Sequence, residues 1–439
     1  MTTKRDDADA TATPHSIAVV GASHAAVHLA DRLRTNGFAG RIALFTDEPH
    51  VPYHRPPLSK GLLKGPIDPS TLSLRAESYF DDQRIDLHRH TRVTGVRRTD
   101  DGVVLELSGE NGCRTETFDR LVLATGARAR RLSLPGADHP DVLVLRDLDD
   151  ADLLRERATA GPVVVIGGGF IGLEVAAGLR AAGTEVTVIE TADRLLARAV
   201  GSHTAAALLR AHESMGTVVL LGRRPVEIVR GDSDGGSDTD SDLGPNHIRG
   251  VRLDDGVVVP AATVIVGIGA EPRTELGEML GLDCDGGIVV DDNCLASDGW
   301  TLAIGDCTVH GSASGRRYRL ESVDNATEQA NAAAAILLGA EPHIRPAPWF
   351  WSDQGAQKLQ IVGLSGGHSE VVHRTDPKRP DRQVSLYFAD GRLVAAECLN
   401  SPADFMTLRT ALNRGHRPSP EVFADESVPI KKLLAPARA

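Results

Sequence analysis

The chain has 439 residues, which is too many for a single hydrophobic core and predicts about two to four domains. Apolar residues make up 41% of the sequence and charged residues 25%, proportions typical of soluble globular proteins. The net charge of −12 argues against a nucleic-acid binder or a protein that lies on anionic membranes. The apolar run that starts at Val163 is broken by a run of three consecutive glycines and by Glu174, so it predicts no membrane span. The N-terminal stretch has no apolar segment, and we expect a disordered tail over residues 1–14 and a cytoplasmic location.

The first predicted unit is a strand at 17–20, a helix at 25–35 and a second strand at 41–45, which indicates a parallel β-α-β arrangement. The turn after the first strand holds Gly21, Ser23 and Ala26 at the three glycine places of a dinucleotide-binding fingerprint. Asp47 follows as the acid expected at the end of the second strand. On these residues alone, nucleotide binding and plain helix-strand packing are equally supported.

A strand-like run at 120–126 leads to a second β-α-β unit over residues 163–190. Here Gly167, Gly169 and Gly172 match the fingerprint fully, and Glu190 stands where an acid accepts hydrogen bonds from a ribose 2′-hydroxyl. Because strand, glycine turn, helix and terminal acid all agree, we expect this unit to bind a dinucleotide. The alternative is a packing unit that uses glycine only for close approach.

The rest of the chain predicts two more strands and a third domain. A polar acidic insert at 231–245 is expected to be a mobile loop, and strand-like runs follow at 262–269 and 301–306. The last hundred residues show short strands, a hairpin turn at 389–391 and a helix at 402–413. The predicted fold class is therefore α/β, with two Rossmann-like nucleotide-binding domains and a C-terminal α+β domain.

The five cysteines form no C-x-x-C pair and predict buried, reduced thiols; they are Cys113, Cys284, Cys294, Cys307 and Cys398. No metal-ligand cluster is visible, so we expect no metal site. No cysteine precedes Cys113.

Six stretches carry a resemblance to a known family: YHRPPLSKG, LVLATGAR, VVVIGGGFIGLEVA, AIGDC, RLESVDNATEQA and PWFWSDQ. From about Ile17 to Leu433 the sequence resembles the FAD-dependent ferredoxin reductases that serve bacterial oxygenases and cytochromes P450, which have a glutathione-reductase-like flavoprotein fold. The first and last stretches are characteristic of this group. The resemblance implies an FAD-binding domain at 15–126 and 256–327, an NAD-binding domain at 127–255 with the acidic loop, and a C-terminal domain at 328–439.

The resemblance also implies site residues, and it decides that the first turn binds a nucleotide. Those expected to bind FAD are Gly21, Ser23, His24, Ala25, Asp47, Arg55, Lys60, Val93, Ala124, Thr125, Gly126, Arg146, Asp306 and Val323. Those expected to bind NAD are Gly167, Gly169, Phe170, Ile171, Gly172, Glu174, Glu190, Arg198 and Gly269. Asp324 departs from the family, which more often has Gln, Trp or Pro at that place.

Several of these residues have an alternative interpretation. The resemblance implies that Lys60 pairs with Glu174 beside the flavin as the catalytic pair, but Lys60 could be a solvated lysine and Glu174 a favourable charge near a helix N-terminus. It implies that Asp306 binds the ribityl chain, whereas the residue type also suits the N-cap of the next helix. Arg55 and Arg146 could be surface arginines.

The expected activity is electron transfer from NADH through FAD to a ferredoxin, which then supplies a cytochrome P450 or another oxygenase. Glu190 predicts NADH over NADPH. The expected ferredoxin-docking residues are Arg316, Arg317 and Trp351, although Trp351 also suits simple interface packing. A monodehydroascorbate-type or diaphorase reductase, and a flavoprotein resembling apoptosis-inducing factor with a binding role, are the alternatives. We expect a monomer or weak dimer with no nucleic-acid or membrane partner.

Overall fold

The computed structural model describes residues 14–60, 68–110, 112–158, 161–231, 247–311, 317–376 and 378–435. Arg316 lies outside these residues. The expected acidic loop also lies outside them, apart from Gly231, and so does the expected tail, apart from Pro14. The chain divides into two compact units. The first comprises Met1–His54, Asp68–Arg128 and Glu271–Pro346, and the second comprises Arg55–Ile67, Ala129–Ala270 and Ala347–Ala439.

The first unit is built on a parallel sheet with strand order β19-β7-β1-β2-β3. These strands are β1 (Ser16–Val20), β2 (Arg41–Phe45), β3 (Ile85–His88), β7 (Arg120–Leu123) and β19 (Leu302–Ala303). Helices α1 (His24–Thr35) and α9 (Val323–Leu337) pack against each other in this unit. Its remaining elements are α3 (Pro69–Leu72), α4 (Glu77–Asp82), β4 (Thr91–Thr99), β5 (Gly102–Gly109), β6 (Gly112–Phe118), α8 (Glu275–Met279), β18 (Ile288–Val290), η1 (Gly305–Cys307), β20 (Thr308–Gly311) and β21 (Arg317–Tyr318). Strands β8 (Ala127–Ala129) and β17 (Ala270–Pro272) lie where the chain passes between units.

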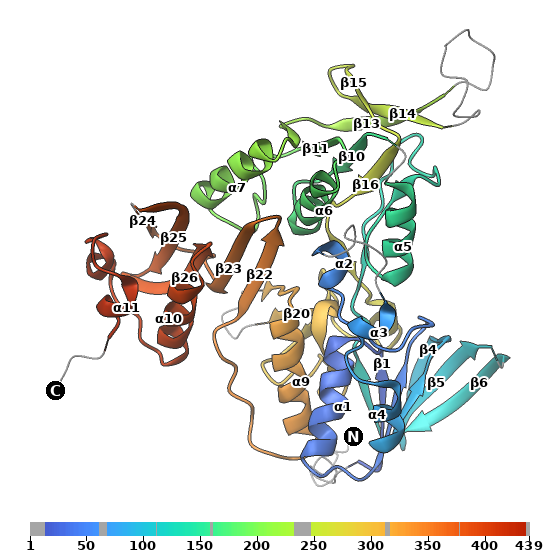
Figure 1. The fold of residues 1–439 in the computed structure, drawn as a ribbon. Helices are drawn as coiled ribbons and strands as arrows, with labels where there is room; N and C mark the ends of the chain where they lie inside the picture. Colours follow the sequence, from blue (N-terminus) through green and yellow to red (C-terminus); the bar gives the residue numbers. More distant parts are fainter. Residues whose placement is uncertain are drawn as a thin grey trace, which may run out of the picture. The chain divides into compact units, whose positions relative to one another are not determined.

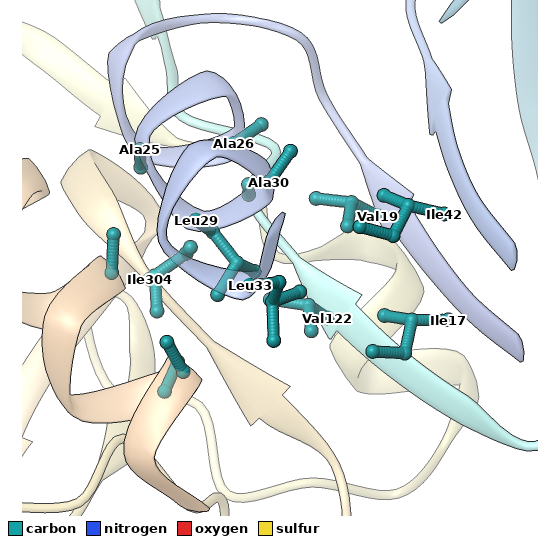
Figure 2. Packing of buried hydrophobic residues seen from close by; sticks show 14 of the residues in the cluster. Ile17, Val19, Ala25, Ala26, Leu29, Ala30, Leu33, Ile42, Val122 and Ile304 are labelled. Atoms are coloured by element: carbon teal, nitrogen blue, oxygen red, sulfur yellow. The ribbon is translucent and has the colours of Figure 1, made fainter. Parts of the chain in front are cut away.

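Helix α1 forms where the sequence places apolar residues at helical spacing. Leu29 and Leu33 are fully buried, and Figure 2 shows the apolar side chains of α1 gathered near Val122 and Ile304. Ala26, at the third fingerprint place, is also fully buried, so one methyl group fits between helix and sheet without opening a gap. The packing fixes the N-terminus of α1 at the edge of the sheet where the strands end.

The second unit contains a parallel sheet with strand order β12-β11-β10-β16-β9. Its strands are β9 (Val142–Leu143), β10 (Val163–Ile166), β11 (Val186–Glu190), β12 (Val218–Leu221) and β16 (Thr263–Val266), and its helices include α5 (Leu148–Arg157), α6 (Phe170–Ala181) and α7 (Ser202–Ser214). An antiparallel sheet joins β13 (Pro225–Arg230), β14 (Ile248–Leu253) and β15 (Val258–Pro260). The expected boundary at residue 256 falls before β15 and β16, both of which pair within this unit.

The C-terminal part of the second unit is the sheet β22-β23-β26-β25-β24, drawn in orange to red in Figure 1. Its strands are β22 (Trp349–Gln354), β23 (Gln357–Gly363), β24 (Glu370–Asp376), β25 (Arg379–Ala389) and β26 (Arg392–Leu399). The expected hairpin turn lies at Asp390 and Gly391, whose φ angles of 49° and 67° are those of a two-residue hairpin turn. Helix α10 (Pro402–Asn413) has the expected bounds, and η2 (Pro420–Phe423), α11 (Ile430–Leu433) and the short α2 (Pro57–Lys60) complete the unit.

The prediction that every cysteine is buried is wrong for two of the five. Cys294, Cys307 and Cys398 are buried, but Cys113 is exposed and Cys284 is half-buried. Cys113 lies in β6, at the edge of its antiparallel sheet, where side chains on the outer face meet solvent. Among the described helices, none is long and apolar enough to cross a membrane.

Candidate functional sites

Three strands of the first unit end together at one edge of the parallel sheet. Val20 of β1 pairs with Leu123 of β7, which in turn pairs with Ala303 of β19. The segments that follow these strands therefore begin side by side. They contain the expected FAD residues of the first turn, the Ala124–Thr125–Gly126 turn and Asp306. In open α/β sheets, ligands bind outside the carboxyl ends of the strands, so this edge is the candidate flavin site.

The turn into α1 brings the backbone N–H groups of the helix N-terminus to the edge of the sheet. Gly21 has φ of +121°, and a Cβ atom there would lie 2.1 Å from the Ala124 carbonyl oxygen, so only glycine fits. Ser23 is the N-cap residue with extended backbone, and its carbonyl accepts the first helical bond from Val27 N–H at 2.9 Å. The N–H groups of the first helical residues, including His24 and Ala25, precede this bond and suit a phosphate.

The loop that carries Asp306 is held beside the first turn of α1. Gly305 has φ of +81°, and a Cβ there would lie 3.3 Å from the Ala25 Cβ. The Gly305 N–H donates to the buried Gln329 Oε1 at 2.6 Å. Asp306 lies inside η1, and α9 is capped by Ser322, which accepts from Asn325 N–H at 3.0 Å. The alternative that Asp306 caps the next helix is therefore wrong.

The remaining FAD candidates of this unit lie around the same sheet edge or on a neighbouring strand. The Thr125 hydroxyl donates to the Arg273 carbonyl at 2.7 Å, and Arg273 N–H donates to the Gly126 carbonyl at 3.0 Å, so the turn after β7 is anchored at two points. Val323 is the first residue of α9. Val93 lies in β4 with a bulge immediately after it, and its side chain is buried.

Asp47 does not end the second strand, contrary to expectation. In the second unit Ile166 pairs with Ile189, and Glu190 follows; in the first unit Val20 pairs with Phe45, so the counterpart of Glu190 is Thr46. Asp47 lies one position further, where its Oδ2 pairs with Arg92 at 3.1 Å and lies 3.6 Å from Arg273. The sequence could not show this shift, because the strand end depends on register.

The glycine turn after β10 has the geometry of a dinucleotide site. Gly167 has φ of +108°, and a Cβ there would meet the Gly267 carbonyl oxygen at 2.5 Å; a Cβ on Gly172 would meet the Gly167 carbonyl oxygen at 2.3 Å. Gly169 differs, because it has ordinary backbone angles and a Cβ would approach no described protein atom within 3.6 Å. The protein itself does not require glycine there, but close approach of a pyrophosphate does, so these residues fit a bound dinucleotide.

Glu190 is oriented by the same turn. Its Oε2 accepts from Gly168 N–H at 2.7 Å, and its Oε1 accepts from Ala192 N–H at 2.8 Å. The Thr191 hydroxyl also donates to Oε1, at 3.3 Å. A carboxylate has about four acceptor positions, so these three bonds fix its direction and leave capacity for a ribose hydroxyl. Arg194 donates to the carbonyls of Ala197 and Val200 and so braces the following loop.

Other nicotinamide-side candidates lie on α6 or after β16. Ile171, in the first turn of α6, is 44% exposed, which is unusual for a large apolar residue and suits contact with a ligand. Phe170 packs against Phe350, with ring centroids 4.5 Å apart. Gly269 follows β16 with φ of +101°, and a Cβ there would lie 3.8 Å from the Arg198 guanidinium.

Lys60 and Glu174 form an ion pair in the second unit. Lys60 Nζ lies 2.9 Å from both carboxylate oxygens of Glu174, and the carboxylate is almost completely buried. Lys60 also lies 5.9 Å from the ring of Trp351. Lys60 is therefore not a solvated surface lysine. Arg55 donates to the Arg146 carbonyl at 2.9 Å, so these two candidates lie together in the same unit.

A half-buried carboxyl group, that of Asp150, lies next to that arginine pair. Arg146 N–H donates to Asp150 Oδ2 at 2.8 Å. Burial, together with the nearby charge of Asp147, raises the pKa of Asp150 to about 6. The local backbone around Arg146 is thus held by an acid that titrates close to neutral pH.

Comparison with known proteins identifies the family of this chain from matches over residues 15–330 and 349–434. Residues 15–330 match the family described as pyridine nucleotide-disulphide oxidoreductase, and residues 349–434 match the reductase C-terminal domain. Rhodocoxin reductase of Rhodococcus erythropolis is 39% identical over 424 residues, which cover 96% of this chain and 94% of that protein. The chain belongs to the ferredoxin reductases of the pyridine nucleotide-disulphide oxidoreductase family.

Solved structures of ferredoxin reductases have the same fold. The ferredoxin reductase for the CYP199A2 system of Rhodopseudomonas palustris is 40% identical, with a TM-score of 0.86 over 96% of this chain and 100% of that one. The covalent putidaredoxin reductase–putidaredoxin complex is 36% identical, with a TM-score of 0.86 over 96% of this chain and 98% of that one. This reductase is therefore an FAD-containing oxidoreductase that uses a pyridine nucleotide.

Sequence reasoning missed three polar residues that the structure places beside the candidates. Gln329 holds the loop of Asp306, His54 Nδ1 lies 3.2 Å from His24 Nε2, and Ser352 donates to Glu174 at 2.6 Å. All three stand inside stretches that carry the family resemblance, so a signal was present. Their partners, however, are distant in sequence, and only the fold reveals them.

Proposed function

We propose that this reductase passes electrons from NADH through FAD, one at a time, to a ferredoxin that supplies a cytochrome P450 or another oxygenase. The observation that carries the proposal is the pair of dinucleotide turns, each at the carboxyl edge of its own parallel sheet. The similarity to rhodocoxin reductase and to a reductase that forms a complex with putidaredoxin supports the choice of acceptor. A cytoplasmic location stays a prediction.

The residues of the first unit would hold FAD, which supplies the ability to accept a hydride and to release its two electrons singly. The N-terminus of α1 and the hydroxyl of Ser23 would bind the pyrophosphate, and Asp306 would bind the ribityl chain. Gln329 keeps the Asp306 loop in place through Gly305 N–H. Asp47 remains our proposed ribose ligand, with Arg92 and Arg273 beside it.

The residues of the second unit would hold NADH. The Gly167–Gly169 turn would approach the pyrophosphate, and Glu190 would accept a hydrogen bond from the adenosine ribose. Lys60 would provide a positive charge on the flavin side, with Glu174 fixing its position. Hydride transfer itself needs no acid or base, so the task of the residues of each unit is to bind and orient its own cofactor.

The absence of an early cysteine supports an external acceptor. Disulphide reductases of this fold pass electrons to a cysteine pair near the start of the chain, and here the first cysteine is Cys113. Electrons must therefore leave the flavin for another molecule, and an iron–sulfur protein accepts them one at a time.

A spectroscopic test distinguishes this function from its alternatives. The purified protein should be yellow, release FAD and not FMN on denaturation, and lose its flavin absorbance when NADH is added without oxygen. Cytochrome c reduction should then depend on added ferredoxin. A protein that reduces monodehydroascorbate faster than ferredoxin, or that keeps its flavin reduced in the presence of ferredoxin, would contradict the proposal.

The proposed docking residues give a second prediction. Arg317 forms an ion pair with Asp285, and Arg319 forms one with Glu321, so the positive charges of this segment are partly balanced by neighbouring acids. Because the chain is −12 overall and ferredoxins are usually acidic, docking needs a local basic surface. Reversing the charge of Arg316 and Arg317 should raise the KM for ferredoxin, whereas Asp285→Asn should lower it.

Ferricyanide serves as the control acceptor, since it needs no docking surface. Both variants should reduce ferricyanide at the wild-type rate, and ferredoxin-dependent turnover of the wild type should fall as salt is added. If the Arg316 and Arg317 reversal slows both acceptors equally, these arginines support the flavin site. If it changes neither, docking uses another face, and Trp351 becomes the remaining candidate.

A further inference from the structure

The buried carboxylate of Glu174 accepts hydrogen bonds from side chains of two separate segments. Lys60 Nζ bonds both oxygens at 2.9 Å, and the neighbouring Ser59 hydroxyl also donates to Oε2. Ser352 Oγ donates to Oε1 at 2.6 Å. Lys60 and Ser59 lie on α2, but Ser352 lies on β22, in the middle of the PWFWSDQ stretch. The C-terminal segment therefore takes part in holding an acid that belongs to the nucleotide-binding helix α6.

The chemistry of the carboxylate fixes the direction of the hydrogen bonds that link Ser352 to Gln354 and Gln354 to His212. A carboxylate only accepts, so the single hydroxyl proton of Ser352 must point to Glu174. The second contact of this hydroxyl, Gln354 Nε2 at 3.2 Å, must then donate. With its nitrogen turned to Ser352, Gln354 presents Oε1 to His212 Nε2 at 3.0 Å, and this ring nitrogen must carry a proton.

The environment of His212 agrees with this direction. His212 lies in the last turn of α7 and is completely buried, as are Gln354 and Ser352. Burial lowers the pKa of His212, so the ring is neutral and carries one N–H. From His212 through Gln354 and Ser352, each group thus donates towards Glu174. Hydrogen bonds aligned in one direction polarise one another and stabilise the negative charge at their end.

We propose that Ser352 is a positioning residue for Glu174, and that Gln354 and His212 fix the direction in which its hydroxyl donates. The inference rests on the proposed function, because Glu174 is assigned there to the placement of Lys60. Ser352 acts through Glu174 and contacts no reacting atom. The C-terminal domain then contributes to hydride transfer as well as to the fold.

Removing the hydroxyl tests the proposal. In Ser352→Ala the carboxylate loses one donor and is free to shift, and a misplacement of about 1 Å in an active site can cost on the order of 100-fold. We therefore expect the rate of flavin reduction by NADH, measured by rapid mixing without oxygen, to fall roughly 10- to 100-fold. The FAD content should not change, and Ser352→Thr, which keeps the hydroxyl, should recover most of the rate.

Two further variants separate positioning from general damage to the sheet. Ser385→Ala is the matched control, because Ser385 is also a buried serine of this sheet but bonds His373 at 3.0 Å instead. It should reduce at the wild-type rate. Gln354→Met removes the amide without greatly changing volume, and should slow reduction less than Ser352→Ala. If Ser352→Ala fails to fold, Gln354→Met carries the test, and wild-type reduction by that variant then overturns the proposal.

A double-mutant cycle with Glu174→Gln decides whether Ser352 acts through Glu174. In the Glu174→Gln background, Ser352→Ala should slow flavin reduction less than twofold. The same cycle measured by thermal unfolding should also be non-additive, since the two side chains bond each other. If the two substitutions have additive effects on the rate of flavin reduction, Ser352 is only a structural residue. The same conclusion follows if the unfolding temperatures are coupled but Ser352→Ala reduces its flavin at the wild-type rate. Failure of NADH to reduce the wild-type flavin would instead refute the proposed function itself.

Discussion

Gly21→Ala should yield a protein that is purified without FAD. A methyl group at this position would lie 2.1 Å from the Ala124 carbonyl oxygen and 2.8 Å from its carbon, and both are backbone atoms that cannot rotate away. The φ of +121° adds a strain of about 1–3 kcal/mol for a residue with a side chain. The turn must move, and with it the N–H groups at the start of α1 and the turn after β7. We expect the FAD dissociation constant, measured by flavin fluorescence, to rise by at least roughly 100-fold, which corresponds to about 2.7 kcal/mol.

Two matched variants show whether the cause is the clash at the flavin site. Gly37 follows the C-terminus of α1 with φ of +86°, but a Cβ there meets no described atom within 4 Å. Gly37→Ala should therefore lower the unfolding temperature slightly and leave FAD binding unchanged. Ser23→Gly restores the second fingerprint glycine but removes the hydroxyl proposed to bind the pyrophosphate, so it should weaken FAD binding far less than Gly21→Ala does. Normal flavin content in Gly21→Ala would show that the edge formed by β1 and β7 is not the FAD site.

The fold and the second glycine turn could be predicted because their signals are local, whereas the first turn was assigned only through the family resemblance. The glycines at positions 167, 169 and 172, the helical spacing of α1 and the Asp390–Gly391 turn each depend on neighbours within a few residues. Asp47 shows the limit of this reasoning. It lies one residue beyond the position that corresponds to Glu190, because β2 ends where its pairing with β1 ends. Cys113 was placed wrongly for a similar reason, because an edge position in β6 cannot be seen from spacing.

The polar contacts that support the candidate residues could not be predicted at all. Ser352 lies 178 positions from Glu174, and Gln329 lies 24 positions from Gly305. No periodicity connects such pairs, and a serine or glutamine inside an apolar stretch is equally consistent with a turn or a surface position. Only burial together with a partner identifies their role, and both follow from the packing of whole elements.

Glu190 provides the last prediction, a change in cofactor preference. Its carboxylate is held by the N–H groups of Gly168 and Ala192, and at the proposed place of the adenosine ribose it would accept from the 2′-hydroxyl and repel a 2′-phosphate. A hydrogen bond to a charged group contributes about 1.5–3 kcal/mol, so the wild type should prefer NADH over NADPH by roughly 10- to 100-fold in kcat/KM. Glu190→Ala should remove most of this preference, in steady-state assays with ferricyanide as acceptor.

The ratio of the two kcat/KM values isolates the effect of the 2′ group. Loss of the bond to Gly168 also loosens the glycine turn, but that change weakens the pyrophosphate contact of NADH and NADPH alike and cancels in the ratio. Arg194 donates to backbone carbonyls, so Arg194→Ala should slow both cofactors without changing their ratio. Glu227→Gln, which removes a half-buried acid paired with Arg252 elsewhere in the unit, should change neither. The wild type could use NADH and NADPH equally, or Glu190→Ala could leave the ratio of the two kcat/KM values unchanged. Either result would mean that Glu190 only braces the turn and that another residue recognises the ribose. Arg198 would then be the first residue to replace.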